Sequence, residues 1–338
     1  MKRVVIDTDA GVDDSIAIAY ASHFPDVTIE LITTVSGNVP VSEVTQNVLY
    51  LRGILGVNSP VFSGAGAPRS RELVTAPEVH GEDGVGGYRK SEGISFRGWE
   101  TGGAASEIVR AARKYGRKLT IISLGPMTNI AQAVMLDAAA IKGIGNVVQM
   151  GGVFSGYGNT SLFTEFNIFV DPESASFVLE SGVKVTFVPL DLTETLFLPR
   201  ELANELLMKI NESSPDLAQL FRKALNYYID YHKRNDKLDG CFLHDAIAVA
   251  AAIHPEWFRF IGSSVSVETQ GKLTAGMTLA DFRKKAGRES SRIAVAFDGV
   301  RFMTDLSRRV FGYRVGTSTV SQKCLRERFV ADFRNHLR

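Results

Sequence analysis

The sequence predicts an α/β fold with a mostly parallel central sheet, helices on both of its faces, and a small antiparallel portion towards the C-terminus. Short runs rich in β-branched residues alternate with helical patterns over residues 3–190. Those runs are largely apolar, which is typical of strands that are buried on both faces. The chain has 338 residues, 45% of them hydrophobic, and is long enough to bury a large core.

Five strands are predicted in the first part of the chain, at residues 3–6, 27–35, 119–124, 146–150 and 183–190. Helices are predicted between and after them, at residues 14–23, 41–55, 104–115, 128–137 and 173–180. In a sheet of this kind, ligands lie beyond the carboxyl ends of the strands. The residues that follow each strand are therefore the first candidates for a functional site.

The rest of the chain continues this pattern with less regularity. Residues 201–234 predict two helices with a break at 213–215, and a further helix begins near His244. Residues 264–269, 277–282 and 291–297 predict strands of a smaller sheet or hairpin, and residues 300–311 predict a helix. Two glycine-rich segments, 63–98 and 151–164, predict long loops. Loops of that length are often functional.

Charge and cysteine content exclude several classes of protein. Lys and Arg number 38 against 37 Asp and Glu, so composition does not support binding to nucleic acid or to an anionic membrane. Cys241 and Cys324 are too few for a disulfide scaffold or a four-cysteine zinc site, and they fit a reducing compartment. The N-terminus lacks a signal-peptide pattern, and no run approaches the ~20 apolar residues of a membrane span. We expect a cytoplasmic protein.

The C-terminal segment, residues 315–338, is basic. Its charged residues are Lys323, Arg326, Arg328, Arg334 and Arg338 against Glu327 and Asp332. A docking or anion-binding segment and a solvated terminal helix both fit, and such charge runs favour the solvated helix. We therefore expect one domain at 1–314 and a tail of unknown role at 315–338.

Four carboxylates crowd the first strand end, in the string DTDAGVDD at residues 7–14. A strand end, a glycine turn and a helix start direct these side chains towards one crevice. Each pair of like charges at ~4 Å costs about 4 kcal/mol at an effective dielectric near 20. Helix capping by Asp13 or Asp14 explains only one or two of the four. Oxygen ligands select Ca²⁺ or Mg²⁺ over zinc, so we expect a metal site.

The same string also suggests a haloacid-dehalogenase-type phosphatase, which begins with a strand and Asp-x-Asp-x-Thr/Val. That enzyme would use Asp7 as nucleophile, with Mg²⁺ and a phosphorylated substrate. Gly11 stands at the Thr/Val position, however, and no clear later Gly-Asp-x-x-x-Asp segment is present. A phosphate-binding P-loop is also absent from the sequence.

The string at residues 7–14 resembles the N-terminal motif of the inosine-uridine preferring nucleoside hydrolases. Eight further segments resemble that family in order and spacing: 33–39 (TTVSGNV), 80–84 (HGEDG), 124–131 (LGPMTNIA), 150–152 (MGG), 165–173 (EFNIFVDPE), 243–245 (LHD), 268–271 (ETQG) and 276–278 (GMT). The resemblance covers about residues 3–312, and Ala10 and Ala246 stand where many members carry proline.

The resemblance implies calcium-dependent hydrolysis of the N-glycosidic bond of ribonucleosides to ribose and free base. The reaction needs an activated water, a stabilised oxocarbenium-like sugar and help for the departing base. The implied Ca²⁺ ligands are Asp9, Asp14, Asp245 and the main-chain carbonyl of Leu124. Asp9 is also expected to take the proton of the metal-bound water, and Asp7 to hold the loop.

The resemblance also implies the substrate contacts. Asp13, Asn38 and Asn167 are expected on the 2′ and 3′ hydroxyls of ribose, Asn159 and Glu165 on the 5′ hydroxyl, and Phe166 against the sugar or in the core. His244 is expected to contact the base and protonate it as it leaves. His80, Tyr228 and His232 are further candidates for the base pocket, although a stripe at helical spacing that includes Tyr228 and His232 also fits core packing.

Two further expectations follow from the resemblance. Purine-dedicated members stack the base on tryptophans, but Trp99 and Trp257 lie outside the pocket segments, which favours uridine, cytidine or inosine. Members are usually dimers or tetramers, so we expect a homodimer or homotetramer. A non-catalytic protein that binds nucleosides or ribose is the alternative from a different class.

Overall fold

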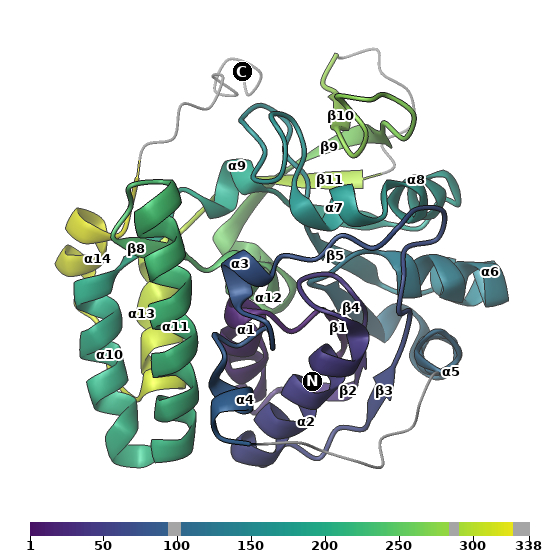
Figure 1. Ribbon diagram of the computed structural model, residues 1–338. Helices are drawn as coiled ribbons and strands as arrows, with labels where there is room; N and C mark the ends of the chain where they lie inside the picture. Colours follow the sequence, from purple (N-terminus) through teal and green to yellow (C-terminus); the bar gives the residue numbers. More distant parts are fainter. Residues whose placement is uncertain (94–102, 284–290, 327–338) are drawn as a thin grey trace.

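A nine-stranded sheet runs through the computed structural model, which describes residues 1–93, 103–283 and 291–326 (Figure 1). Its strands, in spatial order, are β10 (Thr278–Asp281), β9 (Phe258–Val267), β11 (Ser291–Phe297), β6 (Val185–Val188), β5 (Asn146–Met150), β4 (Leu119–Ser123), β1 (Lys2–Thr8), β2 (Val27–Thr34) and β3 (Val61–Ser63). From β11 to β3 all neighbours pair in parallel, and β9 and β10 pair antiparallel at one edge. The predicted fold class is confirmed, and the antiparallel strands extend the main sheet.

Side chains alternate between the two faces of the sheet and enter two apolar clusters. In β1, Val4 and Ile6 join one cluster and Val5 joins the other. The first cluster includes α1 (Val12–Ser22), α2 (Val41–Leu55), α12 (His244–Ile253) and α13 (Gly299–Phe311). The second includes α5 (Ala104–Tyr115), α6 (Thr128–Lys142) and α8 (Pro172–Glu180). Both faces are therefore covered by helices, as the apolar strands predict.

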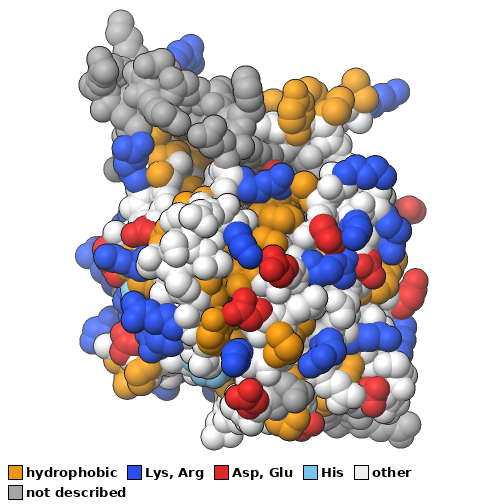
Figure 2. Space-filling model, turned by 90° about the vertical axis from the view of Figure 1, so that its left-hand side faces the viewer, with side chains coloured by type: hydrophobic (Ala, Val, Ile, Leu, Met, Phe, Trp, Pro, Cys, Tyr) orange, Lys and Arg blue, Asp and Glu red, His pale blue; other side chains and the backbone are white. Residues whose placement is uncertain are grey.

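Two long helices, α10 (Arg200–Ser213) and α11 (Pro215–Asn235), stand side by side at one end of the molecule (Figure 1). They meet at the predicted break, where Pro215 begins the second helix. Beside them a two-stranded antiparallel sheet joins β7 (Phe197–Pro199) and β8 (Gly240–Phe242). On this side of the molecule, basic and acidic side chains lie interspersed (Figure 2).

The sequence missed the shortest elements. Besides β3, β7 and β8, these are α3 (Pro77–His80), α4 (Tyr88–Ser91), α7 (Phe166–Val170), α9 (Leu190–Thr193) and two single 3₁₀ turns, Gly116–Lys118 and Pro255–Trp257. Three to five residues give too few positions for a hydrophobic period to be recognised. The predicted loop 63–98 thus contains two short helices, and its last residues, 94–98, lie outside the described part.

The C-terminal segment begins against the body of the domain. Residues 317–323 form α14 (Thr317–Lys323), which contacts α13 and β7. Val320 and Cys324 are fully buried. Arg328, Arg334 and Arg338 lie outside the described residues. Within the described ranges, no helix combines the length and the apolar character needed to cross a membrane.

The order of the strands creates a crevice beside β1. The chain builds β2 and β3 on one side of β1, then crosses over and places β4 on the other side. Such a reversal is a topological switch point, where the loops that leave neighbouring carboxyl ends diverge. The loops after β1, β2, β4 and β5 meet there, and they carry most of the residues that the sequence predicts for the site.

Candidate active site

A cavity of about 710 Å³ lies at the carboxyl ends of the parallel strands. Twelve of the fourteen residues predicted for the site line it: Asp13, Asn38, His80, Leu124, Asn159, Glu165, Phe166, Asn167, Tyr228, His232, His244 and Asp245. The other two, Asp9 and Asp14, are fully buried and do not line the cavity. The sequence segments therefore converge in space although they span more than 230 residues.

The turn after β1 fixes the direction of the acidic side chains. Ala10 has a φ of 37°, a left-handed conformation that non-glycine residues rarely adopt. Two hydrogen bonds to Asp14 hold this turn: Thr8 Oγ1 donates to its Oδ1 at 2.5 Å, and the Gly11 N–H donates to its Oδ2 at 2.8 Å. Asp14 thus caps the start of α1 and ties the strand end to the helix.

Asp9 is packed against backbone with one oxygen unpaired. Its Oδ2 accepts the Asn38 N–H at 2.8 Å, while its buried Oδ1 has no hydrogen-bond partner within the described chain. A Cβ at position 37 would lie 2.1 Å from Asp9 Oδ2, so only glycine fits there. A buried carboxylate oxygen without a partner is costly, and it points to a ligand or a proton to be bound.

Asp13, Asp14 and Asp245, here called the acidic triad, bring their carboxylate oxygens within 4.8 Å of one another. Burial and then the Asp14 charge raise the pKa of Asp13 to about 7. Burial and then the Asp13 charge raise the pKa of Asp245 well above its usual value. Burial and the Asp14 charge do the same for Asp9. These all-oxygen donors fit a hard divalent cation, whose charge would offset the repulsion.

The raised pKa values predict that stabilisation by Ca²⁺ grows with pH. The pKa of Asp13 is 3.8 in the unfolded chain and about 7 in the folded protein, so binding of a proton to Asp13 stabilises the folded state. This stabilisation is complete below pH 4 and is lost as the pH rises through 7. A divalent cation bound by these carboxylates would replace the proton over that range. We expect Ca²⁺ to raise the melting temperature of the chelator-treated protein more at pH 7 than at pH 5, by scanning fluorimetry. A shift that is equal or larger at pH 5 would contradict a carboxylate site.

The predicted ribose partners form a connected set around α7. Glu165 caps this helix, accepting the N–H of Asn167 at 2.9 Å and of Ile168 at 3.2 Å, and burial raises its pKa to about 7. Asn167 Nδ2 donates to the Leu124 carbonyl at 2.7 Å. A carbonyl has two lone pairs, so one remains on Leu124. Asn159 Oδ1 accepts the N–H of the residue after Glu165 at 3.0 Å, which closes the set.

Five rings form a continuous aromatic wall of the cavity: His80, Tyr228, His232, Phe242 and His244. Successive ring centroids lie 5.5, 4.6, 5.6 and 5.6 Å apart in that order. Burial, then the His232 charge, lowers the pKa of His80 to about 3, and burial also lowers the pKa of His232. A flat aromatic molecule such as a nucleobase fits against rings of this kind.

Polar contacts from neighbouring loops fix the histidines of this wall. His244 Nδ1 lies 2.7 Å from Thr193 Oγ1, and His232 Nδ1 lies 2.6 Å from Asp236 Oδ2. Nε2 of His232 is buried and without a partner within the described chain. Each contact orients one nitrogen of its ring, and the other nitrogen of His232 stays available to a ligand.

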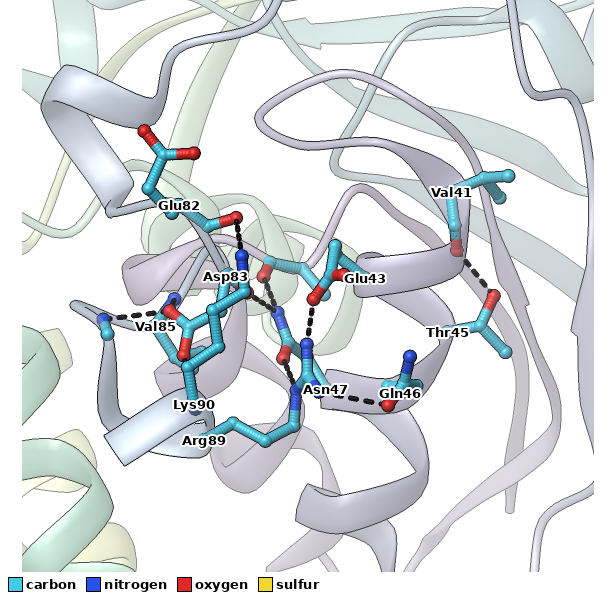
Figure 3. A network of polar contacts seen from close by, with 12 residues as sticks. Val41, Glu43, Thr45, Gln46, Asn47, Glu82, Asp83, Val85, Arg89 and Lys90 are labelled. Atoms are coloured by element: carbon cyan, nitrogen blue, oxygen red, sulfur yellow. Dashed lines mark hydrogen bonds and ion pairs between the residues drawn. The ribbon is translucent and has the colours of Figure 1, made fainter. Parts of the chain in front are cut away.

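The loop that carries His80 is tied to α2 by the network in Figure 3. The Asp83 carboxylate accepts three backbone N–H groups of the following turn, at 2.8–3.2 Å. Asn47 donates to the Asp83 carbonyl at 2.6 Å and accepts from Arg89 at 3.0 Å. Arg89 also pairs with Glu43. This network holds the loop in place, and the Val12 N–H donates to His80 Nδ1 at 3.2 Å.

Sequence reasoning did not place Phe242 or Arg326 at the cavity. Asp13 belongs to the acidic triad, in addition to its expected place at the ribose. Phe242 completes the aromatic wall, and Arg326 lines the cavity from the C-terminal segment. Trp257 stacks on His254 away from this cavity, and Trp99 lies outside the described residues.

Comparisons with known proteins agree with this arrangement. A family model described as inosine-uridine preferring nucleoside hydrolase matches residues 4–304. The non-specific ribonucleoside hydrolase RihC of Salmonella paratyphi A is 34% identical over 310 residues, with 88% of this chain and 95% of RihC covered. RihC of Salmonella enteritidis PT4 is 34% identical over 298 residues, with 88% and 93% covered.

Solved structures show the same similarity. The purine-preferring ribonucleoside hydrolase from Gardnerella vaginalis superposes with a TM-score of 0.84 at 30% identity, covering 92% of this chain and 98% of that one. A plant nucleoside hydrolase gives a TM-score of 0.84 at 29% identity, with 92% and 99% covered. The chain therefore belongs to the inosine-uridine preferring nucleoside hydrolase family, whose members are N-glycosyl hydrolases.

Proposed function

We propose that this protein hydrolyses ribonucleosides to ribose and free base in a calcium-dependent reaction. The observation that carries the proposal is one cavity lined both by Asp13 and Asp245 of the acidic triad and by the aromatic wall. A ribose needs polar partners and a base needs a flat apolar surface, and both are present. Asp245 and His244, adjacent in sequence, join the two parts.

Asp9 is the proposed general base. Asp9, Asp14, Asp245 and the Leu124 carbonyl would hold a Ca²⁺ ion, which would supply a positive charge that lowers the pKa of a nearby water molecule. Asp9 then accepts the water proton on Oδ1, the oxygen that no other described group occupies. The buried acids also favour the positive charge that develops on the sugar as the glycosidic bond breaks.

The remaining polar residues hold the sugar in place. Asp13, Asn38 and Asn167 are proposed to bind the 2′ and 3′ hydroxyls, and Asn159 and Glu165 the 5′ hydroxyl. All five line the cavity, and the capping bonds of Glu165 fix the position of Asn167. Fixed partners keep C1′ close to the attacking water, which lowers the entropy cost of the reaction. Phe166 also lines the cavity and is proposed to pack on the sugar.

His244→Ala is expected to slow hydrolysis of uridine and inosine by about 10²-fold or more, as loss of a general acid does. A nitrophenyl riboside, whose leaving group needs no proton, should lose far less. Steady-state kinetics on both substrates check this. Thr193→Val, which removes only the contact at Nδ1, should give a smaller loss of the same kind. Equal losses of His244→Ala on both substrates would rule out leaving-group assistance.

The competing functions are less well supported by the site. A phosphatase would need Asp7 as an accessible nucleophile, but Asp7 is fully buried, accepts hydrogen bonds from Thr33 and Asn129, and does not line the cavity. A binding protein without catalysis would have no use for a proton acceptor, which is the role proposed for the unpaired oxygen of Asp9, although it would share the metal ligands. Chromatography of the products from inosine decides between them: ribose with hypoxanthine is the expected result, and unchanged inosine would favour a binding protein.

Base preference, cellular location and oligomeric state are further parts of the proposal. The described residues that line the cavity include no tryptophan, and a preference for uridine, cytidine or inosine is proposed from this lining and from the family resemblance. The two buried cysteines, Cys241 and Cys324, are unpaired, which fits a reducing cytoplasm. A homodimer or homotetramer is proposed from the family resemblance alone.

A further inference from the structure

The C-terminal segment contributes a residue to the cavity from outside the region that matches the family. That match ends at residue 304, and Arg326 lies 22 residues beyond it. Arg326 nevertheless lines the cavity together with the histidines of the aromatic wall. Its place there needs explanation, because an exposed arginine near a chain end is ordinarily solvated.

Backbone contacts hold this part of the segment against the loop that follows α9. The Arg326 N–H donates to the Thr195 carbonyl at 2.9 Å, and the Phe197 N–H donates to the Cys324 carbonyl at 2.8 Å. Leu325 forms an antiparallel bridge with Leu196 between them. Cys324 is fully buried beneath these bonds. The segment thus pairs with this loop through a single β-bridge and its two flanking hydrogen bonds, and this pairing sets the position of Arg326.

The guanidinium group of Arg326 stacks on a ring that contacts the aromatic wall. Its central carbon is 4.9 Å from the ring centroid of Phe197, and the Phe197 ring lies 5.4 Å from that of Phe242. Phe242 in turn contacts His232 and His244. The arginine therefore reaches the cavity on the side where the proposed function places the base, and stacking on Phe197 orients its planar fork.

The charge of Arg326 contrasts with the rest of the cavity. Among the described lining residues it is the only lysine or arginine, whereas the lining acids are Asp13, Glu78, Glu165, Glu194, Asp236 and Asp245. An acidic cavity suits a cation and a sugar that becomes positive, but it opposes the negative charge of a departing base. One positively charged side chain on the side of the cavity where the base is proposed to bind would stabilise that negative charge.

We propose that Arg326 determines base specificity by binding the exocyclic oxygen of 6-oxopurines and uracil as the base leaves. This role rests on the proposed function, and it defines the preferred substrates as nucleosides whose base carries a carbonyl oxygen at that position. Guanidinium groups only donate hydrogen bonds, so they pair with a carbonyl oxygen and are mismatched with the amino group of adenine or of cytosine at the same position. Inosine, guanosine and uridine are therefore the preferred substrates, ahead of adenosine and cytidine.

The chemistry of bond cleavage gives this contact its effect on rate. Water oxygen bonds to C1′ as the C1′–N bond breaks, and the electron pair of that bond stays on the base. The charge is shared with the carbonyl oxygen of the base, where Arg326 donates. The base takes up one proton from His244, and Asp9 holds the proton that the water gave up, so the step balances. The contact therefore strengthens in the transition state and raises kcat as well as binding.

Arg326→Ala, measured by steady-state kinetics, tests the proposal. We expect kcat/KM for inosine and uridine to fall about 10- to 100-fold, the size of a lost arginine–carbonyl pair, with a smaller fall for adenosine and cytidine. A nitrophenyl riboside should be unaffected. Lys323→Ala is the matched control, since Lys323 lies on the same segment and pairs with Glu201 outside the cavity. Equal losses on every substrate, or no loss on any, would overturn the proposal.

Equilibrium binding of free bases separates this inference from the proposed function. Titration calorimetry should show that the wild-type protein binds hypoxanthine more tightly than adenine, and that Arg326→Ala removes the difference. If the wild-type protein hydrolyses no nucleoside but shows this difference, the proposed function fails and the role of Arg326 stands. If hydrolysis occurs and both proteins bind the two bases alike, the role of Arg326 is wrong and the proposed function stands.

Discussion

Asp9→Asn should lower kcat by about 10²–10⁴-fold for every nucleoside, the usual contribution of a general base. The amide cannot take a proton from water, yet it keeps the size of the side chain between the two strand ends. Its oxygen can still accept the Asn38 N–H that holds Asp9 Oδ2 at 2.8 Å. Rates with uridine and inosine at saturating Ca²⁺ check the expectation, and circular dichroism confirms that the fold is intact.

Asp7→Asn is the control for that substitution. Asp7 is also fully buried, two residues earlier, but its Oδ1 accepts from Thr33 and Asn129 and it does not line the cavity. We expect this variant to be less stable than the wild-type protein and to keep most of its kcat. If Asp9→Asn retained near-normal kcat, or if Asp7→Asn lost as much, Asp9 would not be the base.

Asn167→Ala should lower kcat/KM by on the order of 10²-fold, to the same extent for every base, because a lost donor or acceptor on the transition state has that effect. Asn167 lines the cavity, and its Nδ2 bridges the Leu124 and Met150 carbonyls at 2.7 and 3.1 Å. The substitution removes a proposed ribose partner and also loosens a proposed metal ligand. The measurement is kcat/KM over a panel of four nucleosides.

A second asparagine serves as the matched control for Asn167. Asn146 lies at the opposite end of β5, where it pairs with Thr186 at 2.9 Å. Asn146→Ala should leave kcat/KM unchanged for the whole panel. A loss at Asn167 that differed between purine and pyrimidine nucleosides would mean that the residue contacts the base, which would contradict its role at the sugar.

The longer strands of the sheet could be predicted because each has a local pattern of apolar and β-branched residues. Residues 146–150 contain the adjacent β-branched pair Val147 and Val148 followed by Gln149 and Met150, and the structure places β5 at Asn146–Met150. The helix at 41–55 was also predicted with its observed bounds. By contrast, β3, β7 and β8 have three residues each, and their pairing depends on distant segments. The pairing of β9 with β11 in the main sheet is likewise a tertiary property.

The family resemblance supplied the individual site residues, and the strand pattern indicated where they would meet. Asp13, Asn38 and Leu124 were expected from the resemblance, and strand order brings them to one cavity. Contacts made between remote loops could not be predicted, since no local pattern encodes them. Thr193 lies 51 residues from the His244 that it orients, and Arg326 reaches the cavity only through the pairing of its segment with the loop after α9.

The decisive measurement is ribose release from uridine, cytidine, inosine and adenosine, each with Ca²⁺, after exhaustive chelation, and after Ca²⁺ is restored. The account predicts release in Ca²⁺, loss of release on chelation and recovery on restoration, with uridine and inosine the fastest. Mg²⁺ in place of Ca²⁺ shows whether the acidic triad is selective. Release that persists at full rate after chelation would contradict a metal at Asp13, Asp14 and Asp245, and absence of release under all conditions would contradict the proposed hydrolysis itself.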